Sequence, residues 1–129
     1  MTAGAELQAA VVAATSSLEL LRGVFDGPPA RAEFPYLVVD CSVEKAWNCS
    51  AHAGREVTCE LTLWDDQPAR ILELEDALEK KIGQLASLPS WQLSSCSFQE
   101  KRKVRNPSGP WSCALRFRAR MLLPLERAN

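Results

Sequence analysis

The sequence predicts an α+β domain in which two helices pack on one face of an antiparallel, at most mixed, sheet of about four to five strands. Two segments repeat apolar residues every three or four positions, as amphipathic helices do. Several others alternate apolar and polar residues, as half-buried strands do. A length of 129 residues, of which 47% are hydrophobic and 24% charged, suits one domain spanning residues 1–129.

The first element is expected to be a helix. Its apolar face is formed by Leu7, Ala10, Val11, Ala14, Leu18 and Leu21. Gly23 stands where a left-handed residue often ends a helix, so we expect the helix to end near Leu21 or Arg22. Val24-Phe25 then predicts a short strand, and the breaker run 26–29 predicts a turn or loop.

Two longer strands are expected next, joined by the polar loop Glu44–Gly54. The first strand, Tyr36–Val43, would turn one set of alternate residues inward: Leu37, Val39, Cys41 and Val43. In the second, apolar Val57, Cys59, Leu61 and Leu63 alternate with polar Glu56, Thr58, Glu60 and Thr62. This alternation indicates one buried and one solvated face.

A second helix and a closing hairpin complete the predicted domain. Asp65-Asp66-Gln67-Pro68 is typical of a helix start, with aspartate as a cap. The buried stripe of this helix is Ile71, Leu74, Leu78, Ile82 and Leu85, and the helix should end before Pro89. One hairpin strand falls within Trp91–Arg105, a turn at 106–109 follows, and the other strand is Trp111–Leu123. The returning strand turns Cys113, Leu115, Phe117, Ala119 and Met121 inward.

Overall charge and hydropathy exclude some classes of protein. Fifteen basic and sixteen acidic residues leave a formal charge of −1, which indicates neither nucleic acid nor an anionic membrane as a partner. No segment reaches the roughly 20 apolar residues that span a bilayer, and Glu6 and Glu19 interrupt the apolar start of the chain. We therefore expect a protein kept in the cytoplasm, with its five cysteines reduced.

Neither an enzyme nor a metal site is expected from the residue pattern. His52 is the single histidine, and no nucleophile and acid are placed with it as a triad would require. The set Cys41, Cys49, His52 and Cys59 lacks the short paired spacing of structural zinc ligands. We expect no catalytic residue, no metal and no cofactor.

Basic residues gather on the last hairpin. They are Lys101, Arg102, Lys103, Arg105, Arg116, Arg118 and Arg120. They could bind phosphate, although no aromatic side chains alternate with them as a base-stacking platform requires. Alternatively, the three arginines of the returning strand face Glu56 and Glu60 of a neighbouring strand. We favour this structural or subunit-interface role.

Trp47 is an aromatic residue in a polar loop, which is typical of a protein interface. Trp47, together with Asn48, His52 and Arg55 from the same segment, forms one part of a candidate protein interface. The basic residues of the hairpin form the other part of this candidate interface.

The order of several motifs resembles one known family. These motifs are Val24-Phe25-Asp26-Gly27-Pro28-Pro29, Phe34-Pro35-Tyr36-Leu37-Val38-Val39, Gly54-Arg55-Glu56-Val57, Leu61-Thr62-Leu63-Trp64-Asp65 and Leu115-Arg116-Phe117-Arg118-Ala119. From Leu7 to about Leu122 the chain is similar to the tail-completion, or tail-terminator, proteins of long-tailed phages, prophages and gene transfer agents. The turn Asn106-Pro107-Ser108-Gly109 and the many cysteines depart from the usual pattern.

The resemblance implies a structural protein that assembles as a ring, six-fold in the family, on the head-proximal end of a tail tube. Such a ring ends tube growth and offers a surface for head joining. The implied partners are further copies of the chain, the major tail-tube protein and a head–tail connector or stopper, with no membrane and no specific nucleic acid. The protein would wait in the host cytoplasm and then join the virion. Two alternatives stay open: another connector or tube-associated subunit, and a nucleic-acid-binding protein that uses the basic hairpin.

Overall fold

The computed structural model describes residues 1–48 and 50–124. In chain order the elements are α1 (Ala3–Thr15), β1 (Gly23–Phe25), β2 (Tyr36–Ala46), β3 (Gly54–Asp65), α2 (Pro68–Gly83), β4 (Gln92–Arg105) and β5 (Trp111–Leu122). The strands form one five-stranded sheet in the order β1-β2-β3-β5-β4. β1 runs parallel to β2, and the other neighbours are antiparallel. The predicted α+β class with a mixed sheet is confirmed.

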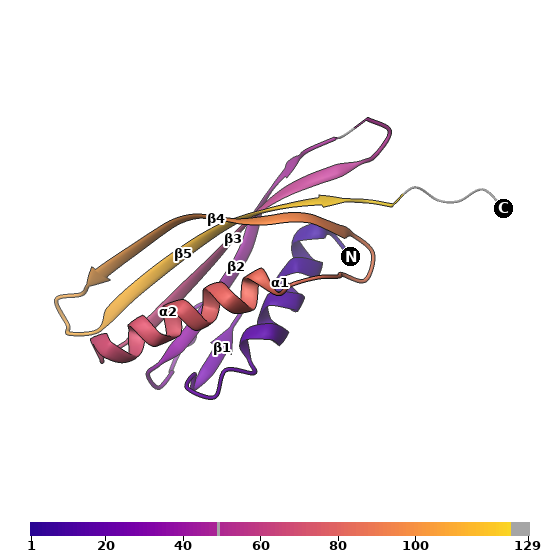
Figure 1. Cartoon of the computed structure of the whole chain (residues 1–129). Helices are drawn as coiled ribbons and strands as arrows, with labels where there is room; N and C mark the ends of the chain where they lie inside the picture. The colour runs from indigo at the N-terminus through magenta and orange to yellow at the C-terminus, as the bar shows by residue number, and fades with distance from the viewer. Residues whose placement is uncertain (49, 125–129) are drawn as a thin grey trace.

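One hydrophobic core lies between the sheet and the two helices (Figure 1). It takes alternate residues of β2, β3 and β5, because successive side chains of a strand point to opposite faces. The largest fully buried side chains include Leu7 and Val11 of α1, Ile71 and Leu78 of α2, and Leu61 of β3. In the part of the chain that the structure describes, the opposite face of the sheet carries no helix, and we call it the open face. In the described residues, neither helix is long and apolar enough to cross a membrane.

α1 is shorter than its apolar spacing predicts. It ends at Thr15, and Gly23 begins β1 instead of following the helix. The hydroxyls of Thr15 and Ser16 donate to the carbonyls of Val11 and Val12, at 2.7 and 2.6 Å. Such local bonds compete with helix propagation. Leu18 and Leu21 still pack against the core, but from turns beyond the helix.

Val43 was predicted to face inward, and this prediction is wrong. The pairing of β2 with β3 shifts register between Asp40 and Val43. A bulge of this kind inserts a residue and reverses the alternation beyond it. Val43 therefore lies opposite Thr58 on the open face, where it is half exposed.

The predicted loop Glu44–Gly54 is largely a continuation of the β2–β3 hairpin. β2 extends to Ala46 and β3 begins at Gly54, and the hairpin projects beyond the body of the domain (Figure 1). We call residues 44–48 and 50–55 the arm. The polar composition of this segment predicted a loop. Strands that lie outside the core need no apolar face, so a polar composition does not exclude a strand. Gly54 is required there, since a Cβ at this position would lie 1.7 Å from the Trp47 carbonyl oxygen.

The start of α2 is held by a buried ion pair. Gln67 occupies the capping position without a side-chain bond, so the predicted aspartate cap is wrong in position. Asp65 instead accepts the N–H groups of Asp66 and Gln67, at 2.7 and 3.2 Å, just before the helix. It also accepts two hydrogen bonds from Arg70, at 2.8 and 2.6 Å. Burial opposes the charge on Asp65, but these bonds outweigh it and lower the pKa of the carboxyl.

Candidate interaction surfaces

A ladder of opposite charges crosses the open face. β3 and β5 are neighbours, and their register places Glu56 opposite Arg120 and Glu60 opposite Arg116. Arg120 lies 3.2 Å and Arg118 3.7 Å from the Glu56 carboxylate. The prediction that the arginine row faces the glutamates of a neighbouring strand is therefore confirmed.

The ladder contributes little to stability because its members are half exposed. Arg116 lies 3.4 Å from Glu60 and 3.0 Å from Glu100 of β4, so the glutamates lie on both sides of the arginine row. Cross-strand pairs of this kind are worth about 0.2–1 kcal/mol each. Their larger effect is to balance the charge of Arg116, Arg118 and Arg120 on the open face.

Trp47 connects the arm to this ladder. Its half-buried ring lies 5.2 Å from the guanidinium of Arg120, a cation–π distance. The ring is therefore placed by the sheet and does not extend freely from a loop. Asn48 has a structural role here, because its side-chain oxygen accepts the N–H of Gly54 at 3.2 Å.

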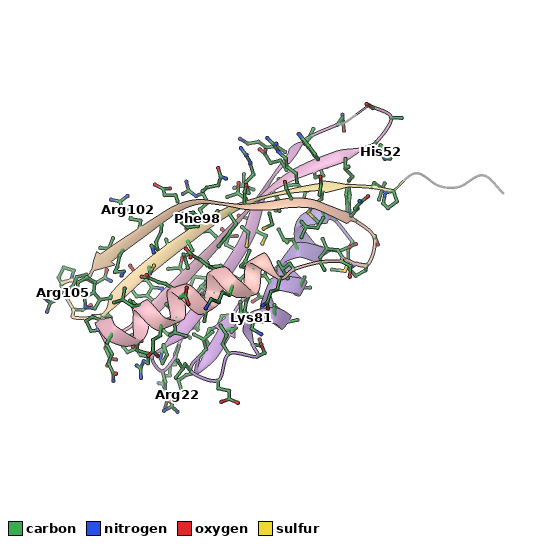
Figure 2. All side chains as sticks on the ribbon, viewed as in Figure 1. Arg22, His52, Lys81, Phe98, Arg102 and Arg105 are labelled. Carbon is green, nitrogen blue, oxygen red and sulfur yellow. The ribbon has the colours of Figure 1, made fainter. Side chains whose placement is uncertain are left out.

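Arg55 and His52 occupy other parts of the arm. Arg55 alternates with Glu56 and so lies on the helix side, 3.4 Å from Glu44 and 6.0 Å from the ring of Trp91. His52 lies far out on the arm (Figure 2), and among the described residues its buried Nδ1 has no partner. The four candidate residues of this segment thus share the arm but do not form one patch.

The seven basic residues of the hairpin are divided between the two faces of the sheet. Lys101 and Lys103 lie on the helix side, 3.3 and 2.8 Å from the buried carboxylate of Glu75 in α2. Arg105 lies 5.9 Å from the ring of Trp111. Arg102 lies on the opposite side of β4, directed away from α2 (Figure 2). The seven residues therefore do not form one patch on a single face of the sheet.

Two buried carboxylates that the sequence reading missed tie the helices to the rest of the domain. Burial opposes the charge of Glu75, but hydrogen bonds from Lys103 and Cys113 lower its pKa. Glu6 of α1 accepts the N–H groups of Ser90 and Trp91, at 2.8 and 3.4 Å, and the Ser90 bond is the main cause of its lowered pKa. Their positions in the sequence could have indicated burial, because each glutamate stands next to a leucine of the core in its helix.

Among the described residues, His52 does not join Cys41 and Cys59 in a metal-binding group. Cys41 and Cys59 lie side by side in the core, where the hydrogen bond between them and burial raise the pKa of Cys59. His52 lies on the arm, and Cys49 of the zinc hypothesis falls outside the described residues. Within residues 1–48 and 50–124, no three side chains of a metal-binding kind come together.

Comparison with known proteins places this geometry in a family. Residues 5–122 match the model of a family described as "Tail completion protein gp17". The fold is similar to that of a chain in the virion of a native gene transfer agent particle, with a TM-score of 0.76 and 21% identity. That match covers 95% of this chain and 99% of the other. No curated protein sequence matches the chain.

Proposed function

Since this chain belongs to the family of the tail completion protein gp17, we propose that it forms a ring on the head-proximal end of a phage-like tail tube. The ring ends tube growth and provides the surface to which the head is joined. The family match, which spans residues 5–122, is the observation that carries the proposal. As a member of a structural family, the chain acts by binding other virion proteins, with no catalytic step.

The placement of the candidate surfaces supports this role. A closed ring needs two different surfaces on each subunit for its neighbours, and the tube and the head connector each need another. Gly54 pairs with Leu122 at one end of β5, whereas Asp65 pairs with Trp111 at the other. The arm and the basic residues 101–105 at the end of β4 therefore lie at opposite ends of the sheet (Figure 1). Contacts at one end leave the other end free.

The physical mechanism we propose is capping by surface mismatch. The tube-facing side of the ring resembles a tube subunit closely enough to bind the last ring of the tube. The opposite side lacks the surface that a further tube subunit needs, so addition stops there. We assign these contacts to the arm and to residues Lys101–Arg105.

The test is electron microscopy of particles made without this gene. Filled heads without tails, beside overlong free tubes, are the expected result. Tubes of normal length in particles that fail only at head attachment would show a connector in place of a terminator. Normal tailed particles would refute both roles.

A further inference from the structure

The two edges of the sheet differ in how they are protected. β1 covers β2 only at Tyr36–Val38. Beyond it, the side-chain amide of Gln8 donates to the carbonyl of Val39 at 2.7 Å and accepts the N–H of Cys41 at 2.8 Å. One amide thus makes the two bonds that a further strand would make. The carbonyl of Val39 and the N–H of Cys41 are therefore not free to pair with an added strand.

The other edge is β4, and in the described chain no segment pairs with its outer side. β4 has fourteen residues, and most of them are exposed. Two large apolar side chains on it are exposed, Phe98 by 47% and Val104 by 41%. A long edge with free N–H and C=O groups is a template for β-strand addition.

Charge restricts which strand can add. Lys101, Arg102, Lys103 and Arg105 carry four positive charges on five successive positions, and Glu75 is the carboxylate that the two lysines share. Glu79 of α2 also attracts Lys101, so four positive charges against two negative ones leave a surplus of two. A second basic strand is repelled by this surplus, whereas an acidic strand is attracted, so the same residues exclude one partner and select another.

A hollow beside β4 adds a second requirement. It has a volume of about 320 Å³ and lies between the end of α2 and the strand. Its lining includes Ile82, Phe98 and Phe117, and Phe98 lies on the side of β4 that faces α2 (Figure 2). A strand added to the edge would direct alternate side chains toward α2, and an apolar one near Phe98 fits this hollow.

We propose that the outer edge of β4 binds an extended, acidic segment of another virion protein as a sixth strand of the sheet. The segment pairs its backbone with β4, places an apolar side chain beside Phe98 and sets its acidic side chains against residues 101–105. The proposal rests on the proposed tail function in one respect, namely that the partner is a protein of a tailed particle. Its chemistry rests on β4 alone.

A synthetic peptide tests this proposal if one half alternates valine and threonine, to lie beside Phe98, and the other half is glutamate-rich, to lie beside residues 101–105 on both sides of β4. The control peptide carries lysine in place of each glutamate. Fluorescence anisotropy should show binding of the acidic peptide that weakens as salt is added, and no binding of the basic one. Arg102→Glu should weaken binding roughly ten-fold. The matched control Arg31→Glu changes an exposed arginine on the loop before β2 and should leave binding unchanged.

Amide hydrogen exchange locates the bound peptide. We expect new protection in residues 92–105 and none in the arm. Protection elsewhere, equal binding of both peptides, or no binding would overturn the proposal. Protection of β4 that grows with protein concentration alone, together with dimers in sedimentation, would also overturn it, because a second copy would then occupy the edge. Deletion of the gene tests the tail function separately. If particles without the gene have normal tails, the proposed function fails, but the peptide-binding results still decide whether β4 binds an acidic strand.

Discussion

Replacement of Asp65 by alanine should destabilise the domain far more than the same change at Asp66. The Asp65 side chain is fully buried and receives two hydrogen bonds from Arg70, whose side chain is 25% exposed. Removal of one partner from a buried pair costs about 3–5 kcal/mol. Because water can partly solvate Arg70, we expect the lower end, about 3 kcal/mol. In a domain of this size that corresponds to a fall in melting temperature of roughly 10 °C.

The neighbouring aspartate is the matched control. Asp66 contacts the same guanidinium at 3.4 Å, but its side chain is 57% exposed. Its replacement by alanine should cost no more than about 0.5 kcal/mol. Urea unfolding followed by tryptophan fluorescence measures both free energies. If the two variants differ by less than about 1 kcal/mol, burial of the pair does not determine its contribution, and the reasoning is refuted. Adding Arg70→Ala to Asp65→Ala should cost little more, since the partner is already lost.

Three further predictions concern the arm and the buried carboxylates. Trp47→Ala should leave the circular dichroism spectrum intact but reduce co-sedimentation with tail tubes. The control Leu72→Ala, which changes an exposed apolar residue of α2, should change neither the spectrum nor the co-sedimentation. If the Trp47→Ala chain is unfolded, Trp47 is a purely structural residue. Gly54→Ala should cost about 1–3 kcal/mol in urea, because the added methyl meets backbone that cannot move aside, and an unchanged midpoint would contradict this contact. Stability should be complete above the usual carboxylate pKa of about 4 and fall as the pH drops through the lowered folded-state pKa values of Glu6, Asp65 and Glu75. Acid titration of the unfolding free energy measures this loss, and a flat profile between about pH 5 and pH 2 would contradict it.

Local periodicity predicted most of the fold because burial follows the geometry of each element. Leu61 and Leu115 face the core as their alternation requires, and the arginines of β5 meet the glutamates of β3 for the same reason. Periodicity gave the wrong burial or the wrong element boundary where contacts outside the local pattern determine the structure. Val43 turns outward at a bulge that exists only in the pairing with β3. Leu18 keeps the helical spacing, although hydroxyl groups have already ended α1.

The candidate site was predicted in part. The arginine row and its glutamates followed from strand alternation alone. The separation of Lys101 and Lys103 from Arg102 required knowing that α2 places Glu75 over one side of β4. That contact joins positions 26 residues apart, and no local pattern reports it. The arm was recognised as a polar segment with an aromatic residue, but its strand structure depends on pairing between Ala46 and Arg55.

The amide of Gln8 occupies two backbone groups of β2 that a further strand would need. With these two groups of β2 occupied and the outer side of β4 unpaired in the described part of the chain, the subunit resembles a monofunctional monomer in polymer chemistry. Such a monomer ends a growing chain and cannot propagate it. Loss of the amide would free the Val39 carbonyl and the Cys41 N–H to pair with a strand of another molecule. Gln8 thus opposes extension of the sheet from this side of the subunit, which is one of the ways in which proteins avoid forming fibres.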